Sequence, residues 1–249
     1  MESIKSAPSV GIKVKRLLQD PKGVLIRKKH ALKRRFDPVV REQDRLSQMT
    51  GPSGYWDELR AYQLSFMKRM GLMPSDRLLD IACGPLQGGI AFIEYLDRSR
   101  YCGIDVCEKA VSEAYKQVLQ YDLVKKNPTL VRSDSFGLDE IDGRQFDFAW
   151  CCQTMYIFEE PVMDRFFKAV ATHLRPGGQL FGDILGASNT EAVKYVWHGY
   201  RQILYTPDSV ERLARRHGLV MTRVGPIHEY GYPVPCGLRD NEMLRFEKA

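Results

Sequence analysis

The sequence predicts an α/β fold with a mostly parallel, doubly wound sheet. From residue 78 onward, short apolar stretches alternate with longer stretches whose apolar residues recur at helical spacing. Turn residues separate these stretches, and such a β-α-β-α order is typical of parallel sheets covered by helices. The chain has 249 residues, of which 44% are hydrophobic and 27% charged, which is enough for one such domain with an extension.

Each predicted element has its own sequence signal. Seven apolar stretches are predicted strands: 78–82, 101–106, 129–132, 146–152, 179–185, 219–224 and 242–247. Helices are predicted before the first strand, with Tyr55, Leu59, Tyr62, Phe66 and Met70 on one face, and after the first and second strands. Pro161 fits the first turn of a further helix that ends at 175–178, and Thr206-Pro207 begins another that ends at Gly218.

Positive charge is concentrated near the N-terminus. Residues 11–41 hold eleven Lys or Arg and two Asp, a charge of +9, so the formal net charge of +6 leaves −3 for the rest. We therefore predict a basic helical arm over residues 1–50 and one domain over 51–249. Such an arm can contact an anionic membrane surface or a phosphate-bearing carrier, although a solvated pair of surface helices explains the charge equally well. Its apolar stripe is weak, so a firm membrane anchor is not expected.

The location of the protein in the cell and the redox state of its cysteines are predicted from signals that the sequence lacks. No apolar run is long enough to span a bilayer, and residues 1–10 lack the apolar stretch of a signal peptide. The six cysteines contain no Cys-x-x-Cys pair, so reduced core residues are favoured over disulfides or a zinc site. We expect a cytoplasmic protein, with the arm allowing a peripheral position at the inner membrane surface.

The most informative segment is residues 78–89, LLDIACGPLQGG, a strand followed by a turn of small residues and the start of a helix. Small residues let the backbone approach a ligand, and a helix start offers free N–H groups. In open α/β sheets ligands bind at the carboxyl ends of the strands, where the strand order reverses. Asp105 ends the second strand, where a carboxylate can hold both ribose hydroxyls, and Asp134 ends the third, near an adenine amino group.

These residues resemble a known family. The pattern Asp80-x-Ala82-x-Gly84 is similar to the first motif of class I S-adenosylmethionine-dependent methyltransferases, written Asp/Glu-x-Gly-x-Gly. The resemblance extends through both later carboxylates to Cys152-Gln153 and the Leu-Arg-Pro-Gly-Gly turn at 174–178, and it leaves out the arm. Ala82 stands where the family often has glycine, and its side chain restricts the backbone conformations that the turn can adopt. Residues 83–89 are also similar to a subgroup of glycan-modifying and biosynthetic enzymes.

The resemblance implies a seven-stranded sheet with an antiparallel last strand, and S-adenosylmethionine as the cofactor, released as S-adenosylhomocysteine. Asp80 and Gly84 would lie beside the methionine part, Asp105 at the ribose and Asp134 near adenine. Cys152 and Gln153 would border the sulfonium. The complete set of expected cofactor-binding residues is Tyr55, Trp56, Asp80, Ala82, Gly84, Asp105, Val106, Asp134, Ser135, Cys152 and Gln153.

Two other classes share this kind of turn. A nicotinamide-dependent enzyme would have Gly-x-Gly-x-x-Gly, and here positions 82 and 87 are Ala and Gln, so that class fits poorly. A non-catalytic module that binds the cofactor without transferring a methyl group is the other alternative, because the acidic residues indicate cofactor binding but not turnover.

Methyl transfer from a sulfonium is an in-line displacement, for which positioning alone can lower the barrier by roughly 7–11 kcal/mol. A general base adds about 10²–10⁴-fold, so its absence does not exclude the reaction. His198 and His228 are the candidate bases, each equally interpretable as a surface histidine, and Tyr156 is placed to touch the acceptor. Asp183 could orient a base, bind a metal or be a buried, hydrogen-bonded carboxylate. We see no carboxylate cluster spaced for a divalent cation and expect no metal.

The acceptor is predicted from the segments after the fourth and fifth strands. Methylation of a nucleobase amino group usually goes with Asn/Asp-Pro-Pro-Tyr after the fourth strand, but here residues 152–155 read Cys-Gln-Thr-Met. Aromatic residues are frequent in these segments and suit sugars and planar metabolites. We therefore expect O-methylation of a small-molecule or carbohydrate hydroxyl. RNA methylation remains the alternative because of the basic arm, and the oligomeric state is undetermined.

Overall fold

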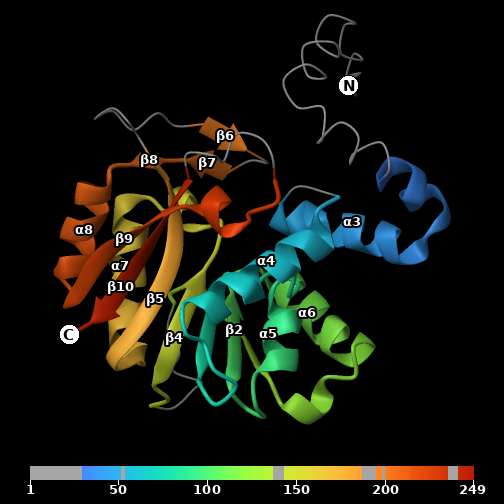
Figure 1. Cartoon of the computed structure of the whole chain (residues 1–249), viewed down its shortest axis with the longest axis horizontal. Coiled ribbons are helices and arrows are strands. Elements are labelled where there is room, and N and C mark those ends of the chain that lie inside the picture. The colour runs from blue at the N-terminus through green and yellow to red at the C-terminus, as the bar shows by residue number, and fades with distance from the viewer. Residues whose placement is uncertain (1–29, 52–53, 137–142, 187–194, 198–199, 235–240) are drawn as a thin grey trace, which may run out of the picture.

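The computed structural model describes residues 30–51, 54–136, 143–186, 195–197, 200–234 and 241–249. Its main sheet contains the seven predicted strands: β1 (Leu78–Ile81), β2 (Tyr101–Asp105), β3 (Thr129–Arg132), β4 (Phe146–Cys151), β5 (Leu174–Gly186), β9 (Leu219–Pro226) and β10 (Asn241–Lys248). Their order is β3-β2-β1-β4-β5-β10-β9 (Figure 1). Strand β10 is antiparallel to β5 and β9, whereas the pairs from β3 to β5 are parallel. The predicted doubly wound, mostly parallel sheet is confirmed.

The sheet separates two layers of helices because alternate strand residues point to opposite faces. In β1, Leu79 and Ile81 pack into one core with helices α7 (Glu160–His173) and α8 (Pro207–Arg215). Leu78 faces the other core with α4 (Trp56–Arg69), α5 (Gly89–Tyr95) and α6 (Glu108–Gln120). The same alternation recurs in β4, where Ala149 and Cys151 face the first core and Trp150 the second. Both layers therefore anchor the strand ends rigidly.

Three short strands were not predicted. Strand β8 (Leu204–Tyr205) pairs in parallel with the end of β5, and β6 (Tyr195–Trp197) forms a separate antiparallel pair with β7 (Tyr200–Gln202). Strands of two or three residues are too short for the period-two alternation by which a strand is recognised in a sequence. The sheet is thus eight-stranded once β8 is counted.

Strand β5 begins earlier than predicted. The sequence favours a turn at 174–178, but the pairing with β4 already starts at Leu174, opposite Phe146. The next partners are Phe148 and Gln179, so the residues between Leu174 and Gln179 form an irregularity in the ladder. Gly177 has a φ of +73° there, a value that glycine adopts without strain. The turn is therefore present, but it lies inside the strand as the structure defines it.

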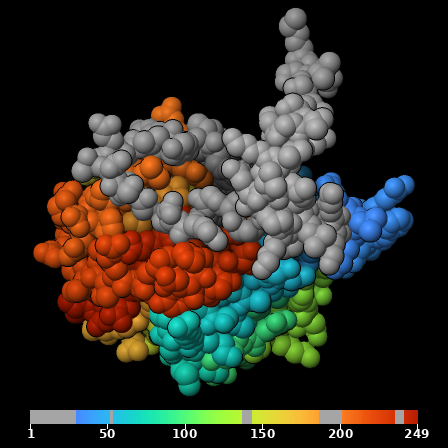
Figure 2. Space-filling view, turned by 45° about the horizontal axis from the view of Figure 1, so that its top comes forward, coloured from blue at the N-terminus to red at the C-terminus, as the bar shows by residue number. Residues whose placement is uncertain are grey.

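The described part of the arm consists of a helical stretch at 30–36 and helix α3 (Pro38–Thr50). Asp37 caps α3 by accepting a hydrogen bond from the amide of Val39 at 2.8 Å, and proline occupies the first turn. The guanidinium of Arg45 binds Glu113 of α6 at 2.6 Å, which holds α3 against the domain while residues 30–50 project at its side (Figures 1 and 2). The boundary at residue 50 stays a prediction.

The described part of the chain contains three 3₁₀ turns: η1 (Val124–Lys126), η3 (Met155–Ile157) and η4 (Ile227–Tyr230). The turn η3 follows β4 and η4 follows β9, so both lie between the carboxyl end of a strand and the next element. In the described ranges, no helix combines the length and the apolar character needed to cross a membrane.

Candidate functional site

The candidate site lies where the strand order reverses, between β1 and β4. These strands are parallel neighbours, with Asp80 opposite Trp150, but the chain leaves β1 toward β2 and leaves β4 toward β5 on the other side. The two following segments, 82–89 and 152–154, therefore diverge from the carboxyl ends of both strands. Open α/β sheets bind their ligands at this point.

The turn after β1 is held by a carboxylate of β2. The amide of Gly84 donates to Asp105 Oδ2 at 2.9 Å, and the amide of Cys107 donates to Asp105 Oδ1 at 2.8 Å. Ala82 and Gly84 have φ values of +58° and +54°, so the chain reverses through two left-handed residues. Burial raises the pKa of Asp105 above its usual range, against the lowering effect of the two amides. The structure thus brings together Ala82, Gly84 and Asp105.

Asp80 is the carboxylate at the base of this turn. Its side chain is buried, and the Tyr101 hydroxyl donates to Oδ2 at 2.6 Å. Burial raises the pKa of Asp80 to about 7, the Tyr101 hydrogen bond opposes this, and the nearby charge of Asp105 adds to it. The Asp80 carboxylate therefore takes up a proton at a higher pH than an ordinary aspartate does.

The turn is packed closely against the end of α3. A Cβ atom at position 84 would lie 3.0 Å from Thr50 Cγ2, so a larger residue than glycine would press on α3. Thr50 Oγ1 and Gln87 Nε2 are buried and have no hydrogen-bond partner in the described part of the chain. Buried polar groups are seldom left unpaired, and these two offer a hydroxyl and an amide to a polar ligand. A nucleoside with an amino-acid moiety, such as S-adenosylmethionine, fits this set of groups.

The turn after β4 has a second polar network. Gln153 has a φ of +57°, rare for a residue with a side chain and a mark of local strain. Its backbone amide donates to Asp183 Oδ1 at 2.5 Å, and its side-chain amide donates to Asp183 Oδ2. The hydroxyls of Tyr156 and Tyr232 donate to Gln153 Oε1 at 3.3 and 3.1 Å. Three residues, from η3, β5 and the segment after η4, therefore converge on Gln153, which follows β4.

Asp183 is the fully buried centre of this network. Besides Gln153 it accepts a hydrogen bond from Asn241 Nδ2 at 2.7 Å. Burial raises the pKa of Asp183 to about 6, although the hydrogen bonds from Gln153 and Asn241 act in the opposite direction. Of the roles that the sequence left open for Asp183, the structure therefore shows the buried, hydrogen-bonded carboxylate.

The remaining expected cofactor residues occupy different surroundings. Tyr55 and Trp56 are buried at the start of α4. Val106 is 60% exposed at the end of β2, which leaves an apolar surface beside Asp105. Asp134 and Ser135 are exposed after β3, where Asp134 forms an ion pair with Arg132 at 3.0 Å. Contact of these five residues with a cofactor stays a prediction.

The candidate bases are less defined. His198 lies outside the described residues, and His228 is exposed on η4. Tyr156 is buried in the Gln153 network, and burial raises its pKa well above the usual tyrosine value, so it stays protonated at neutral pH. Tyr156 can therefore act as a hydrogen-bonding group and not as a phenolate base.

Several residues of the site, among them Tyr62 and Asn241, were not predicted from the sequence as site residues. The Tyr62 hydroxyl is buried without a hydrogen-bond partner among the described residues, and its ring meets that of Tyr232 edge-on at 5.2 Å. Tyr62 lies on the apolar face of a helix, where an aromatic residue is read as core. Asn241 begins β10, and a polar residue before an apolar strand gave the only signal of its role.

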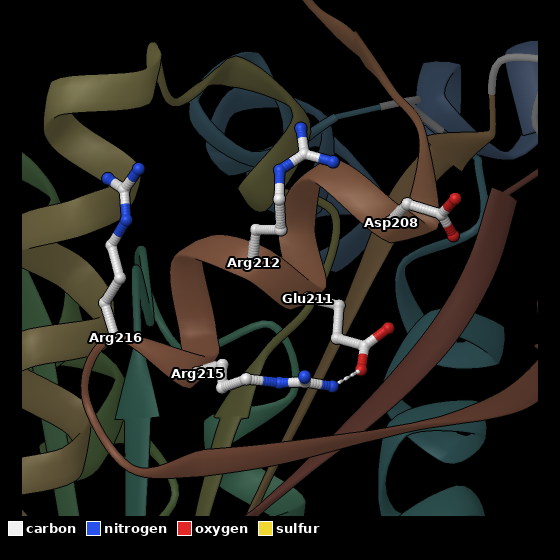
Figure 3. A pocket seen from close by; sticks show the side chains of 5 residues that line it. All are labelled: Asp208, Glu211, Arg212, Arg215 and Arg216. Carbon is white, nitrogen blue, oxygen red and sulfur yellow. Dashed lines mark hydrogen bonds and ion pairs between the residues drawn. The ribbon is translucent and has the colours of Figure 1, made fainter.

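A surface hollow lies elsewhere, on α8 (Figure 3). It is lined by Asp208, Glu211, Arg212, Arg215 and Arg216, and the Glu211–Arg215 ion pair spans one turn of the helix. All five side chains are charged and come from one helix and its C-terminal end. This hollow lies away from the converging strand ends of the β1–β4 site, so we assign it no part in ligand binding.

Comparison with known proteins agrees with this geometry. Residues 78–178 match the family model of a methyltransferase domain. A probable methyltransferase, ltbC of Aspergillus luteorubrus, is 24% identical over 124 residues, which are 48% of this chain and 42% of that protein. The match therefore spans less than half of the relative's length.

Solved structures share the fold. The magnesium protoporphyrin IX methyltransferase ChlM of Synechocystis PCC 6803, solved with bound S-adenosylmethionine, has a TM-score of 0.56 at 14% identity and covers 99% of this chain and 100% of its own. The glycopeptide N-methyltransferase MtfA, in complex with S-adenosylhomocysteine, has a TM-score of 0.59 at 16% identity, with coverages of 77% and 90%. At such identities the likeness shows the fold alone.

The family match and the fold confirm the resemblance found in the sequence. Residues 78–178 thus match a methyltransferase domain, and the chain shares its fold with solved S-adenosylmethionine-dependent methyltransferases.

Proposed function

We propose that the protein binds S-adenosylmethionine at the β1–β4 strand ends and transfers its methyl group to a hydroxyl of a small molecule or carbohydrate. One observation carries this proposal. The Asp80–Gly84 turn, tied to Asp105, and the Gln153 network lie at the ends of two neighbouring parallel strands. A cofactor held by the first can therefore present its reactive end to an acceptor held by the second.

The residues of the first group suit the polar parts of the cofactor. Asp105 already accepts two hydrogen bonds from backbone amides, so its oxygens are oriented to accept others from ribose hydroxyls. The left-handed turn at Ala82 and Gly84 brings the backbone close to the ligand. Thr50 and Gln87 supply polar atoms that have no partner in the described chain. The bound cofactor supplies an electrophilic methyl group on its sulfonium.

The second group suits an acceptor with polar and apolar parts. Tyr62, Tyr156 and Tyr232 place aromatic rings and hydroxyls beside Gln153, a combination that binds sugars and planar metabolites. The named substrates of the two solved neighbours, a glycopeptide and a porphyrin, are also compounds of this kind. Barrier lowering by positioning, roughly 7–11 kcal/mol in well-oriented systems, is the contribution we assign to this site.

The first test of this proposal is calorimetric titration of the full chain with S-adenosylhomocysteine, with NAD as the matched control. We expect micromolar binding of S-adenosylhomocysteine and none of NAD. Incubation with radiolabelled S-adenosylmethionine and a panel of hydroxylated acceptors then tests transfer. Binding without transfer to any hydroxyl, amine or RNA would leave the binding-module alternative, and transfer to RNA alone would favour the RNA methyltransferase.

For the basic arm we propose contact with an anionic membrane. Leu32 and Phe36 lie one turn apart in the helical stretch 30–36 and are 65% and 74% exposed, and Val39 at the start of α3 is 52% exposed. Lys33 and Arg35 are exposed beside them. Exposed apolar side chains with flanking basic residues are typical of helices that bind anionic lipid surfaces.

Vesicle sedimentation tests this contact. We expect the full chain to sediment with vesicles that contain phosphatidylserine and to remain in solution with phosphatidylcholine alone. The double variant Leu32→Ser, Phe36→Ser should lose most of this binding, because each buried side chain contributes roughly 1.5–3 kcal/mol. Val220→Ser, which alters a 60% exposed residue of β9, is the control and should bind as before. Equal binding by all three proteins would exclude the arm helix as the contact.

A further inference from the structure

The side-chain amide of Gln153 can have only one orientation. Asp183 is fully buried, and as a carboxylate it accepts hydrogen bonds but donates none. The Gln153 nitrogen must therefore face Asp183 Oδ2, as observed, and Oε1 must face the opposite way. The Gln153 backbone amide and Asn241 complete the coordination of the carboxylate, which leaves it no freedom to turn.

This orientation determines the orientation of two hydroxyl groups. Gln153 Oε1 can only accept, so the hydroxyls of Tyr156 and Tyr232, at 3.3 and 3.1 Å, must donate their protons to it. A phenol has a single proton. Burial raises the pKa of both tyrosines well above the usual range, so neither loses that proton at neutral pH. Each phenol oxygen therefore has only lone pairs left to offer to a ligand.

The network consequently recognises one class of chemical group. A hydroxyl or an amino group can donate a hydrogen bond to the phenol oxygens, whereas a carbonyl, carboxylate or phosphate oxygen would meet lone pairs and be repelled. The negative charge of Asp183 behind Gln153 favours a neutral or cationic group over an anion. Selection against a group lacking the donor is strong when it leaves buried polar atoms unpaired.

We propose that Gln153, Tyr156 and Tyr232 form an acceptor subsite that selects a hydrogen-bond donor, the proton-bearing hydroxyl or amino group that receives the methyl. This inference rests on the proposed function, because it assumes that the cofactor directs its methyl group from the Asp80–Gly84 turn toward the end of β4. The subsite places the acceptor atom with its proton toward the tyrosines and a lone pair free for the methyl group. The two tyrosines are thus positioning and selecting groups.

Two cofactor analogues test the subsite without knowledge of the acceptor. In sinefungin a carbon that bears a primary amine replaces the sulfur and its methyl group, whereas S-adenosylhomocysteine keeps the sulfur and has no group in the methyl position. Calorimetry gives the ratio of their dissociation constants for the wild type, Tyr156→Phe and Tyr232→Phe. We expect each variant to bind sinefungin about tenfold or more weakly and S-adenosylhomocysteine within about twofold of the wild type, because only the amine loses a hydrogen-bond acceptor.

Tyr95→Phe is the matched control. Its hydroxyl donates to the Leu72 carbonyl at 3.0 Å, in the segment before β1, and its loss should leave both affinities unchanged. If Tyr156→Phe and Tyr232→Phe both keep the wild-type ratio of the dissociation constants of sinefungin and S-adenosylhomocysteine, the subsite is overturned and the cofactor assignment stays intact. Failure of the wild type to bind either analogue would instead overturn the proposed function, and the subsite with it.

Discussion

The amide of Gly84 donates a hydrogen bond to Asp105 Oδ2, so the turn after β1 is joined to the carboxylate that ends β2. Parallel pairing of Ile81 with Ile104 brings the two strand ends together. The geometry of the proposed ribose and methionine parts of the site therefore depends on one side chain.

We predict that Asp105→Ala weakens binding of S-adenosylhomocysteine by about 10–100-fold, because hydrogen bonds to a charged group contribute roughly 1.5–3 kcal/mol. Calorimetric titration measures the change. Asp97→Ala alters an exposed aspartate between α5 and β2 and should bind like the wild type. Equal losses in the two variants would show that Asp105 has no special relation to the ribose.

The substitution Ala82→Gly should stabilise the protein. Ala82 has a φ of +58°, where a residue with a Cβ is strained by roughly 1–2 kcal/mol. Glycine removes this strain but loses about 0.4–1 kcal/mol through the entropy of the unfolded chain. We expect a net gain of up to about 1 kcal/mol, seen as a rise of a few degrees in Tm by calorimetry.

The same exchange within a helix serves as the control. Ala61→Gly, at an exposed position inside α4, should lower Tm, because glycine is about 1 kcal/mol less favourable than alanine in a helix interior. Opposite signs for one chemical change would isolate the backbone conformation at position 82. A fall in Tm for Ala82→Gly would mean that the turn needs the methyl group for packing.

Asp80 should make the stability of the protein depend on pH. Burial raises its pKa to about 7 in the native state, against an ordinary value of 3.8. The native state thus holds a proton that the unfolded state releases, so stability falls as pH rises from about 4 to about 7 and is level above that range. The full difference is on the order of 4 kcal/mol.

Asp80→Asn should remove this part of the pH dependence, while the Tyr101 hydroxyl keeps an oxygen to bind. Thermal unfolding at pH 5 and pH 8 measures the effect, and we expect a smaller difference in Tm between the two pH values for the variant. Some slope should remain, because burial raises the pKa of Asp105 and Asp183 in the same direction. An identical slope in both proteins would contradict a buried, protonatable Asp80.

The parts of the fold that could be predicted from the sequence are those indicated by patterns of neighbouring residues. The seven strands of the path carry apolar runs with turn residues beside them, and the helix beginning at Thr206-Pro207 has a capping side chain that accepts from the Ser209 amide. Ala82 could be recognised as a departure from the family motif, but its strained backbone angle could be seen only in the structure.

The Gln153 network could not be predicted in the same way. Apart from Gln153 and Tyr156, its residues lie far apart in the sequence, and Asn241 meets Asp183 only because β10 pairs with β5 so that Met243 is opposite Asp183. A shift of one residue would turn Asn241 to the other face of the sheet. Sequence patterns indicate which faces are apolar, but not which polar residue finds another across the sheet. The role of Tyr62 could not be predicted for a related reason, because the helical face on which it lies contributes to both the core and the site.

Asp183→Asn should reverse the hydrogen-bond polarity of the acceptor subsite. The oxygen of the introduced amide can still accept from the Gln153 backbone amide, but its nitrogen would then face the side-chain nitrogens of Gln153 and Asn241. Both of these side-chain amides must flip to present their oxygens. The nitrogen of Gln153 would then donate to Tyr156 and Tyr232, whose protons would point toward the ligand instead.

We therefore expect Asp183→Asn to bind sinefungin about tenfold or more weakly relative to S-adenosylhomocysteine than the wild type does, although neither tyrosine has been changed. Asp147→Asn is the control, since Asp147 accepts from the Arg77 amide at 2.7 Å at the far end of β4 and should keep the wild-type ratio. Circular dichroism verifies that both variants are folded. A wild-type ratio in a folded Asp183→Asn protein would mean that the orientation of Gln153 does not depend on the charge of Asp183, and the selection of a donor group would then need another cause.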